Sequence, residues 1–328
     1  MQVGAILTPA RTQADDLNGP VDVQRRDGFV AGSLDGGLTI LGNDLLERTA
    51  TMLSSAGVKR PTVVYEALPL NRLPVDCSSK VTSSSSVWEQ ALSQSVQSGV
   101  DVLLVIGAAA YTELDYSELV RFHLERRAAM TQVYADGAPL DIVVIDTAQL
   151  RDTGGACIRK IGALRAECEQ FNYPGYANRL RGPEDFMQLV EDALYRRCEL
   201  RPAATEIANG LWIANGAEVD DSCVIGAPSF IGDYSRIAAC CNISGGSAIE
   251  SACHVDSGTI IERSWILSNT YIGIGLNVRR SIVSKRKMFH LDRKTEITTT
   301  DRRLFGSTRS LPLLPAERRR GRGTSVSN

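Results

Sequence analysis

The sequence predicts two parts of different class, an α/β domain with a mostly parallel sheet and a C-terminal left-handed parallel β-helix. Two observations support this division. Strand-like and helix-like segments alternate up to about residue 200. A six-residue repeat then dominates residues 213–284. The chain has 328 residues, which is enough to build two hydrophobic cores.

The expected strands of the first part are short apolar runs bounded by turn residues. They are Val3–Leu7, Pro61–Tyr65, Val102–Ile106, Thr131–Tyr134 and Asp141–Ile145. Four helices are expected. The first has its N-cap at Asn43 and ends at Gly57, and the second covers Val87–Val96 and begins with a Ser86–Glu89 capping box. The third covers Ser117–Arg126, and the fourth begins at Pro183. This alternation predicts a Rossmann-like, mostly parallel sheet with helices on both faces.

Ligands of such sheets bind beyond the carboxyl ends of the strands. That rule selects the segments that follow Leu7, Tyr65 and Ile106. We therefore expect any ligand site of the α/β domain to be built from these segments.

The repeat places an aliphatic residue at every sixth position and a small residue four positions later. The aliphatic series is Ile213, Val219, Ile225, Ile231, Ile237, Ile243, Ile249, Val255, Ile261 and Leu267. The small series is Ala217, Cys223, Ser229, Ser235, Cys241, Ser247, Cys253 and Thr259. Each six-residue segment is expected to form one side of a triangular coil, with the aliphatic residue inside and the small residue near a corner. Residues 213–284 thus make about four coils, with a phase slip of one residue between Leu267 and Ile272.

Other positions of the repeat predict contacts outside the coil interior. Trp265 replaces a small residue, which indicates a domain contact or a cover for the end of the coils. The adjacent cysteines Cys240 and Cys241 are expected to split across a corner, one inside and one outside. The outward apolar positions are expected to serve self-association or docking of the α/β domain. These positions are Val224, Phe230, Ile260 and Ile266.

Composition excludes several classes of partner. The net charge of −2, from 36 basic and 38 acidic residues, supplies no basic field for nucleic acid. No apolar run reaches the length of about 18 residues that a membrane span needs, and MQVGAILTPA does not resemble a signal peptide, so we expect a cytoplasmic protein. The eight cysteines include no CxxC pair, which favours buried thiols over zinc ligands.

These patterns divide the chain into three segments. We expect an α/β domain over residues 1–200 and the β-helix domain over 207–310. The basic segment 311–328, which contains AERRRGRGTSVSN, lacks apolar periodicity and is expected to be a disordered tail.

Four segments carry a resemblance to a known family. They are GLTILGNDLLERTATMLSSAGV (37–58), LDYSELVRFH (114–123), GYANRLRGPEDFMQLVEDAL (175–194) and SWILSNTYIGIGLNVRRSIV (264–283). In this order they resemble the second helix, the segment after the metal-binding strand, the end of the catalytic domain and the closing β-helix coils of the sugar-1-phosphate nucleotidyltransferases, also called NDP-sugar pyrophosphorylases.

The resemblance implies a chemistry. In that family a sugar 1-phosphate attacks the α-phosphate of a nucleoside triphosphate, and pyrophosphate leaves. Catalysis rests on positioning and on neutralising negative charge. A glycine-rich loop with an arginine, a nearby lysine, and two aspartates that hold Mg²⁺ supply these functions.

The sequence departs from the family at each of these places. The segment after the first expected strand holds Pro9, Ala10, Arg11 and Thr12 instead of a glycine-rich loop, and Pro9 removes a backbone donor. Where the family has an aspartate after Gly107, this chain has Ala108, whose methyl group offers no oxygen ligand to a metal. The second family aspartate aligns with Arg179, which reverses the charge.

Three readings of function follow. The first is a catalytically impaired, nucleotidyltransferase-like protein of sugar-nucleotide or exopolysaccharide metabolism, which acts as a binding or regulatory subunit. The second is an active nucleotidyltransferase with Mg²⁺ held by relocated carboxylates, for which the candidates are Asp15, Asp16, Asp22 and Asp115. The third is an acyltransferase of the hexapeptide-repeat type with His254 as the catalytic base. The expected partners are a sugar phosphate or nucleotide and further copies of the chain, which associate through the β-helix.

Overall fold

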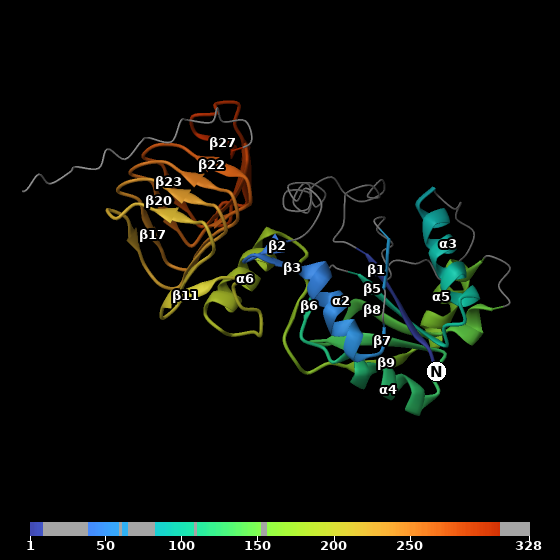
Figure 1. Cartoon of the computed structure of the whole chain (residues 1–328). Coiled ribbons are helices and arrows are strands. Elements are labelled where there is room, and N and C mark those ends of the chain that lie inside the picture. Colours follow the sequence, from blue (N-terminus) through green and yellow to red (C-terminus); the bar gives the residue numbers. More distant parts are fainter. Residues whose placement is uncertain (9–38, 59–60, 65–82, 108–109, 152–155, 309–328) are drawn as a thin grey trace, which may run out of the picture.

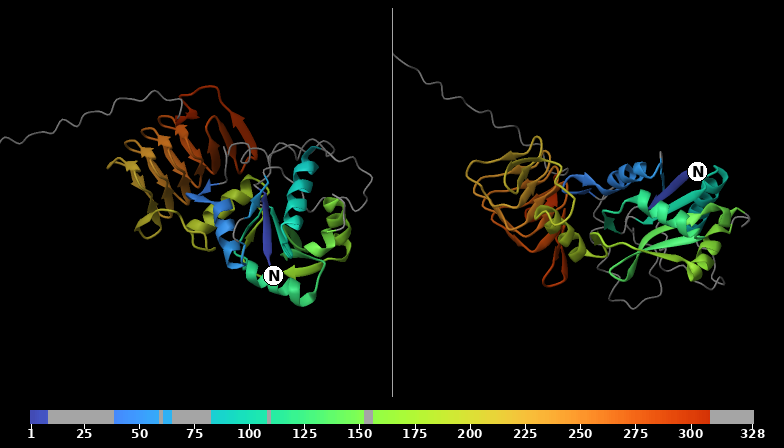
Figure 2. Two further views of the ribbon diagram at one scale, coloured as in Figure 1. Left: turned by 45° about the vertical axis from the view of Figure 1, so that its right-hand side comes forward. Right: turned by 90° about the horizontal axis from the view of Figure 1, so that it is seen from below.

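A computed structural model describes residues 1–8, 39–58, 61–64, 83–107, 110–151 and 156–308 (Figure 1). The expected tail 311–328 lies outside the described residues. The α/β domain and a stack of parallel strands, which we call the strand stack (residues 205–307), lie side by side in all views (Figures 1 and 2).

The described strands of the α/β sheet follow the order β4-β1-β5-β8-β7-β9. They are β4 (Thr62–Val63), β1 (Val3–Thr8), β5 (Val102–Gly107), β8 (Ala138–Asp146), β7 (Met130–Ala135) and β9 (Glu169–Asn172). Strands β4, β1 and β5 run parallel, and so do β7 and β9, but β8 runs antiparallel to both of its neighbours. The sheet is therefore mixed. The expectation of a mostly parallel sheet is corrected at β8, because the β7–β8 connection is a tight hairpin.

Helices cover both faces of this sheet, as the alternation predicts. Helices α2 (Leu45–Ser55) and α4 (Tyr116–Arg126) pack on one face, against Leu104 and Ile106 of β5. Helices α3 (Ser83–Gln97) and α5 (Cys157–Leu164) pack on the other face, against the alternate residues of the same strand. Because β5 is buried on both faces, its sequence is a continuous apolar run. The 3₁₀ turns Thr147–Leu150 and Arg165–Glu167 follow β8 and α5.

Two expected helix caps have different roles in the structure. Asp44, rather than Asn43, caps α2 by accepting hydrogen bonds from the backbone N–H of Leu46 at 2.8 Å and of Glu47 at 3.3 Å. Helix α3 begins at Ser83, and Glu89 does not form the expected capping box. Its carboxylate instead accepts from the backbone N–H groups of Cys157 and Ile158 and so caps α5.

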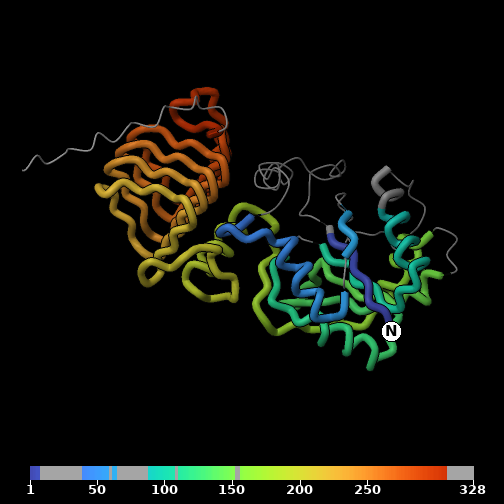
Figure 3. The backbone as a smooth tube through the Cα atoms, viewed as in Figure 1, coloured from blue at the N-terminus to red at the C-terminus, as the bar shows by residue number. Residues whose placement is uncertain are grey.

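The described strands of the strand stack pair in parallel, each with the third strand after it, and so form three sheets. The first sheet contains β12 (Leu211–Ile213), β15 (Ser229–Ile231), β18 (Ser247–Ile249), β21 (Trp265–Ile266) and β24 (Ser281–Ser284). The second contains β13 (Glu218–Val219), β16 (Arg236–Ile237), β19 (His254–Val255) and β22 (Thr270–Ile272). The third contains β14 (Val224–Ile225), β17 (Asn242–Ser244), β20 (Ile260–Glu262) and β23 (Asn277–Arg279). Figure 3 shows the chain passing from sheet to sheet in successive turns, which is compatible with a β-helix.

Antiparallel strands extend two of these sheets. Strand β11 (Thr205–Ala208) pairs with β12, while β25 (Lys287–His290) and β26 (Thr295–Thr298) continue the first sheet beyond β24. Strand β27 (Phe305–Ser307) pairs with β22 in the second sheet. The hairpin at the end of the first sheet therefore covers strand edges that would otherwise be open there.

The interior of the strand stack contains the aliphatic series that the repeat predicts, with one correction. Ile231, Ile249 and Ile266 pair in succession and point inward, so Ile266 occupies the interior and Leu267 packs instead at the domain contact. The coil between Ile249 and Ile266 is one residue short, and the phase slip therefore precedes Ile266. Of the expected outward positions, Ile266 therefore lies inside, Phe230 is buried in the contact with the α/β domain, as expected for docking, and Val224 is 63% exposed.

Polar members of the small series act as hydrogen-bond donors at the coil corners. The hydroxyl of Ser235 donates to the backbone oxygen of Glu250 at 2.8 Å, and that of Thr259 donates to Gly273 at 2.7 Å. The thiol of Cys241 donates to Asp256 at 3.2 Å in the same way, while its neighbour Cys240 is exposed, as predicted. A small side chain is needed because each donor reaches a carbonyl of the next coil within the narrow interior.

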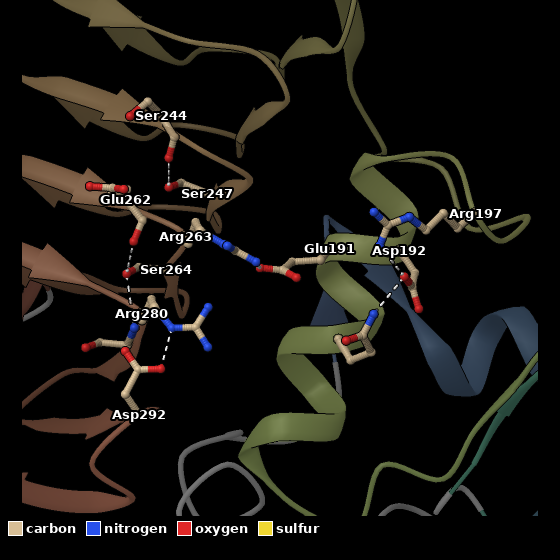
Figure 4. Close-up of polar contacts among 12 residues, drawn as sticks. Glu191, Asp192, Arg197, Ser244, Ser247, Glu262, Arg263, Ser264, Arg280 and Asp292 are labelled. Carbon is tan, nitrogen blue, oxygen red and sulfur yellow. Dashed lines mark hydrogen bonds and ion pairs between the residues drawn. The ribbon is translucent and has the colours of Figure 1, made fainter.

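Helix α6 (Pro183–Leu194) joins the two parts through a shared core. Its apolar face carries Phe186, Met187, Leu189, Val190, Ala193 and Leu194. This face packs on Trp212, Phe230, Ala248, Trp265, Ile282 and Phe289 of the first sheet. The predicted domain contact of Trp265 is thus confirmed. At the edge of the contact, Arg263 of the strand stack pairs with Glu191 of α6 at 3.0 Å (Figure 4).

Candidate functional site

The carboxyl ends of β1, β4 and β5 meet at one edge of the α/β sheet, because these strands are parallel and in register. Leu7 lies beside Val63 on one side and Ile106 on the other. This edge is the one that the sequence selects for a ligand site. The candidate residues Pro9, Ala10, Arg11, Thr12 and Ala108 all lie outside the described residues.

Asp141 is the carboxylate that the structure brings to this edge. It is the neighbour of Ile142, which pairs with Ile106 of β5, and it therefore lies beside Gly107. A Cβ added at Gly107 would lie 2.7 Å from the Cβ and 3.6 Å from the carboxyl carbon of Asp141. Glycine is needed at position 107 because any side chain there would collide with Asp141. The sequence places Asp141 in a strand, but only the sheet order places it beside β5.

Among the described residues, the side-chain oxygens at this edge do not form a binding site for a magnesium ion. Mg²⁺ prefers several oxygen ligands in octahedral geometry, usually including one or two carboxylates. Across the described part of the chain, no group of three or more His, Cys, Asp or Glu side chains is arranged to hold a metal. Asp141 alone supplies one carboxylate, and Arg179 supplies no oxygen ligand.

Arg179 follows the short strand β10 (Ala177–Asn178), which pairs with β6 (Tyr111–Thr112). Its guanidinium donates to the backbone oxygen of Pro139 at 2.7 Å and of Ala138 at 3.0 Å, and it also donates to Ala135. These carbonyls belong to the β7–β8 hairpin, two to six residues before Asp141. Converging carbonyl oxygens attract a cation and repel a carboxylate, so position 179 is built for an arginine.

Two tyrosines that the sequence did not single out contact each other through their rings, and their hydroxyl groups bind two separate carboxylates. The ring centroids of Tyr111 and Tyr176 are 5.9 Å apart in an edge-to-face arrangement. The Tyr111 hydroxyl donates to Glu113 at 3.1 Å, and the Tyr176 hydroxyl donates to Asp192 at 2.7 Å. Burial raises the pKa of both phenols well above the usual value, so both remain protonated donors at neutral pH.

Asp192 of α6 receives further donors that complete this contact. Its second carboxylate oxygen accepts from Gln188 at 2.8 Å and from Arg197 at 3.2 Å (Figure 4). Arg48 of α2 lies 4.5 Å from the centroid of the Tyr111 ring. Each of these carboxylates thus has its own donors, and the arrangement is a satisfied hydrogen-bond network.

His254 lies on the outward side of β19, in a row with Arg236 and Tyr271 of the adjacent strands. Its ring stacks on the Tyr271 ring, with centroids 5.7 Å apart and an interplanar angle of 27°. Burial lowers the pKa of His254, Asp256 opposes this shift, and Arg236 adds to it. The Asp256 carboxylate accepts from the Tyr271 hydroxyl at 3.0 Å. Asp256 is thus held by Tyr271, and the catalytic role of His254 stays a prediction.

No helix in the described ranges is long and apolar enough to cross a membrane. The chain matches no protein-family model, and a comparison with characterised proteins finds no significant match.

Proposed function

We propose that the chain is a catalytically impaired relative of the sugar-1-phosphate nucleotidyltransferases, with a nucleotide or sugar phosphate site at the carboxyl edge of β1 and β5. In this proposal it acts as a binding or regulatory subunit in sugar-nucleotide or exopolysaccharide metabolism. The strand stack is a left-handed β-helix of hexapeptide repeats. Two observations support this proposal. Four segments of the sequence resemble segments of the family and occur in the same order, and the buried aliphatic residues are spaced six residues apart.

The observation that carries the proposal is the hydrogen bonding of Arg179. Its guanidinium is engaged by three backbone oxygens of the β7–β8 hairpin, at the position where the family holds a metal-binding aspartate. Nucleotidyl transfer requires neutralisation of a triphosphate by a metal that carboxylate oxygens anchor. The half-buried guanidinium of Arg179 fixes the β7–β8 hairpin. It therefore has a structural function in place of metal binding.

A binding function needs fewer groups than catalysis. Arg11 follows β1, and an arginine at that point supplies a bidentate donor for a phosphate. The carboxyl edge of a parallel strand group is a common place for such ligands. Binding without turnover is therefore the function that these residues support best.

Ligand-induced stabilisation of the full chain tests this proposal. We expect at least one nucleoside triphosphate or sugar 1-phosphate to raise the melting temperature in a concentration-dependent way. Arg11→Ala is expected to raise the ligand concentration needed for the same rise in melting temperature about tenfold or more, since it removes a charged hydrogen-bond donor to the phosphate. Arg121→Ala is the matched control, because this side chain is exposed on α4. The absence of any ligand-induced shift, or equal shifts in the Arg11 and Arg121 variants, would contradict the proposal.

A further inference from the structure

Glu250 is a fully buried carboxylate at the contact between the two parts of the chain. It follows β18 of the strand stack. One of its oxygens accepts from the backbone N–H of Leu41 at 2.7 Å and from the indole Nε1 of Trp265 at 2.9 Å. The other accepts from the backbone N–H of Gly42 at 3.1 Å. Two of these three donors belong to the α/β domain, so the carboxylate joins the two parts directly.

The donors from the α/β domain are the tip of a tight hairpin. Strands β2 (Thr39–Ile40) and β3 (Asn43–Asp44) are joined by Leu41 and Gly42, whose φ angles are 52° and 78°. Positive φ at both central residues is the conformation of a type I′ turn. A Cβ added at Gly42 would lie 3.1 Å from Ala203 and 3.5 Å from Phe230, which shows how closely the tip is enclosed.

Neighbouring residues hold the hairpin in this position. The Asn43 side-chain amide donates to the backbone oxygen of Arg201 at 2.8 Å. Asp44 immediately begins α2 as its N-cap. The position of the hairpin tip on Glu250 therefore fixes the start of a helix that covers the α/β sheet.

The groups that shift the pKa of Glu250 are the N–H donors of Trp265, Leu41 and Gly42, which oppose the effect of burial, and none of them is a cationic side chain. Asp44, on the hairpin, accepts from the N-terminus of α2, and Glu191, on α6, pairs with Arg263. Within the strand stack, the Cys253 thiol interacts electrostatically with Glu250, and burial raises the pKa of that thiol to about 12. The compensation for an ionised Glu250 thus comes from three N–H dipoles.

We propose that Glu250 is a proton-sensitive latch that fastens the β2–β3 hairpin of the α/β domain to the strand stack. A proton on the oxygen that faces Gly42 gives up the hydrogen bond from the Gly42 N–H, which is the longest of the three, and leaves the other oxygen free to accept its two shorter hydrogen bonds. It also removes the cost of holding a charge in a fully buried contact. Because the cost of a charge in this fully buried contact outweighs the loss of the Gly42 hydrogen bond, the neutral form fastens the hairpin more tightly than the ionised form.

The direction of the pH dependence follows from linkage. Burial raises the pKa of Glu250 from 4.5 to about 7 in the docked state, while the Trp265, Leu41 and Gly42 donors oppose the shift. A side chain released to water returns to its ordinary pKa. The latch is thus tightest below the ordinary pKa, loosens as the pH rises through about 7, and is constant at higher pH.

Hydrogen exchange of the full chain measures the latch at its three N–H donors. We expect the protection of the Leu41 and Gly42 amides and of the Trp265 indole N–H to fall about tenfold or more between about pH 5 and about pH 8. Glu250→Gln keeps an oxygen acceptor but carries no charge, and its protection factors are expected to be independent of pH. Glu191→Gln is the matched control, since it removes an acidic group from the edge of the same contact, and it should retain the wild-type pH profile.

Direct titration keeps the proposal testable if the Glu250 variant does not fold. The carbon-13 resonance of the Glu250 carboxyl in the wild-type chain is expected to titrate well above the ordinary glutamate value. Titration at the ordinary value, or identical pH profiles for the wild type and Glu250→Gln, would overturn the proposal. Because no ligand is involved, these outcomes are independent of the proposed function.

Discussion

Phe186 of α6 and Trp265 of the strand stack lie face to face, with ring centroids 6.2 Å apart and an interplanar angle of 25°. Trp265 is fully buried, and its indole N–H also donates to Glu250. Apolar stacking and a buried polar contact therefore meet at one side chain of the domain contact. This arrangement predicts that the two parts unfold as one cooperative unit.

Truncation of this side chain tests that coupling. Trp265→Ala is expected to lower the free energy of unfolding by about 3–5 kcal/mol, because it leaves a cavity in the shared core and removes one of the three hydrogen bonds to the buried Glu250 carboxylate. Denaturant unfolding followed by fluorescence and by far-UV circular dichroism measures the effect. Tyr234→Ala is the control, since Tyr234 is 75% exposed, and it should change stability little. A Trp265 variant as stable as the control would contradict the account.

Arg179 is expected to contribute to stability through the hairpin that it binds. Arg179→Ala removes donors from three backbone oxygens and should cost about 1–3 kcal/mol in unfolding free energy. Arg181→Ala is a matched control, because that side chain is 74% exposed and pairs only at the surface with Asp185. Equal losses in the two variants would show that the carbonyl contacts of Arg179 have no special role.

The hydroxyl groups at the coil corners make a separate prediction. Thr259 donates to the backbone oxygen of Gly273 at 2.7 Å and accepts from the backbone N–H of Leu276 at 3.2 Å. Thr259→Val keeps the shape but leaves both backbone groups buried without this partner, at a cost of about 1–3 kcal/mol. Chemical denaturation checks this value. The same change at exposed Thr295 should be nearly neutral, and a neutral result at Thr259 would refute the corner role.

His123 predicts a loss of stability in acid. Burial lowers its pKa and Asp146 partly opposes the shift, while Nδ1 lies 2.8 Å from the Thr131 hydroxyl. The folded state therefore favours the neutral ring, and this stability is present above the ordinary pKa of 6.5 and is lost as the pH falls through the lowered value. Unfolding of His123→Gln across this range should show a weaker acid dependence than the wild type. His290→Gln serves as the control, and a profile of His123→Gln identical to the wild type would refute the prediction.

Local patterns in the sequence predicted the repeat but not its exact phase. The interior positions of Ile231, Ile249 and Val255 follow directly from the six-residue spacing. The spacing does not decide whether Ile266 or Leu267 lies inside. Both residues are aliphatic, and a coil that is one residue short can lose that residue before or after either of them. Only the pairing of Ile249 with Ile266 decides between them.

Contacts between distant segments could not be predicted from local patterns. Leu41 and Glu250 are separated by 209 residues, and neither has a neighbour in sequence that indicates the other. Asp141 reaches Gly107 because β8 is antiparallel to β5, and strand spacing alone does not specify that order. The arginine at position 179 was visible in the sequence, whereas the hairpin oxygens that it binds were not.

Pyrophosphate release tests the central claim most directly. The wild-type chain is mixed with magnesium, a panel of nucleoside triphosphates and a panel of sugar 1-phosphates, and pyrophosphate is measured against time. The account predicts binding without release above the uncatalysed background, because in the proposed relation to the nucleotidyltransferases position 179 holds an arginine in place of a metal ligand. Magnesium-dependent release that is proportional to the protein concentration and persists after further purification would contradict it.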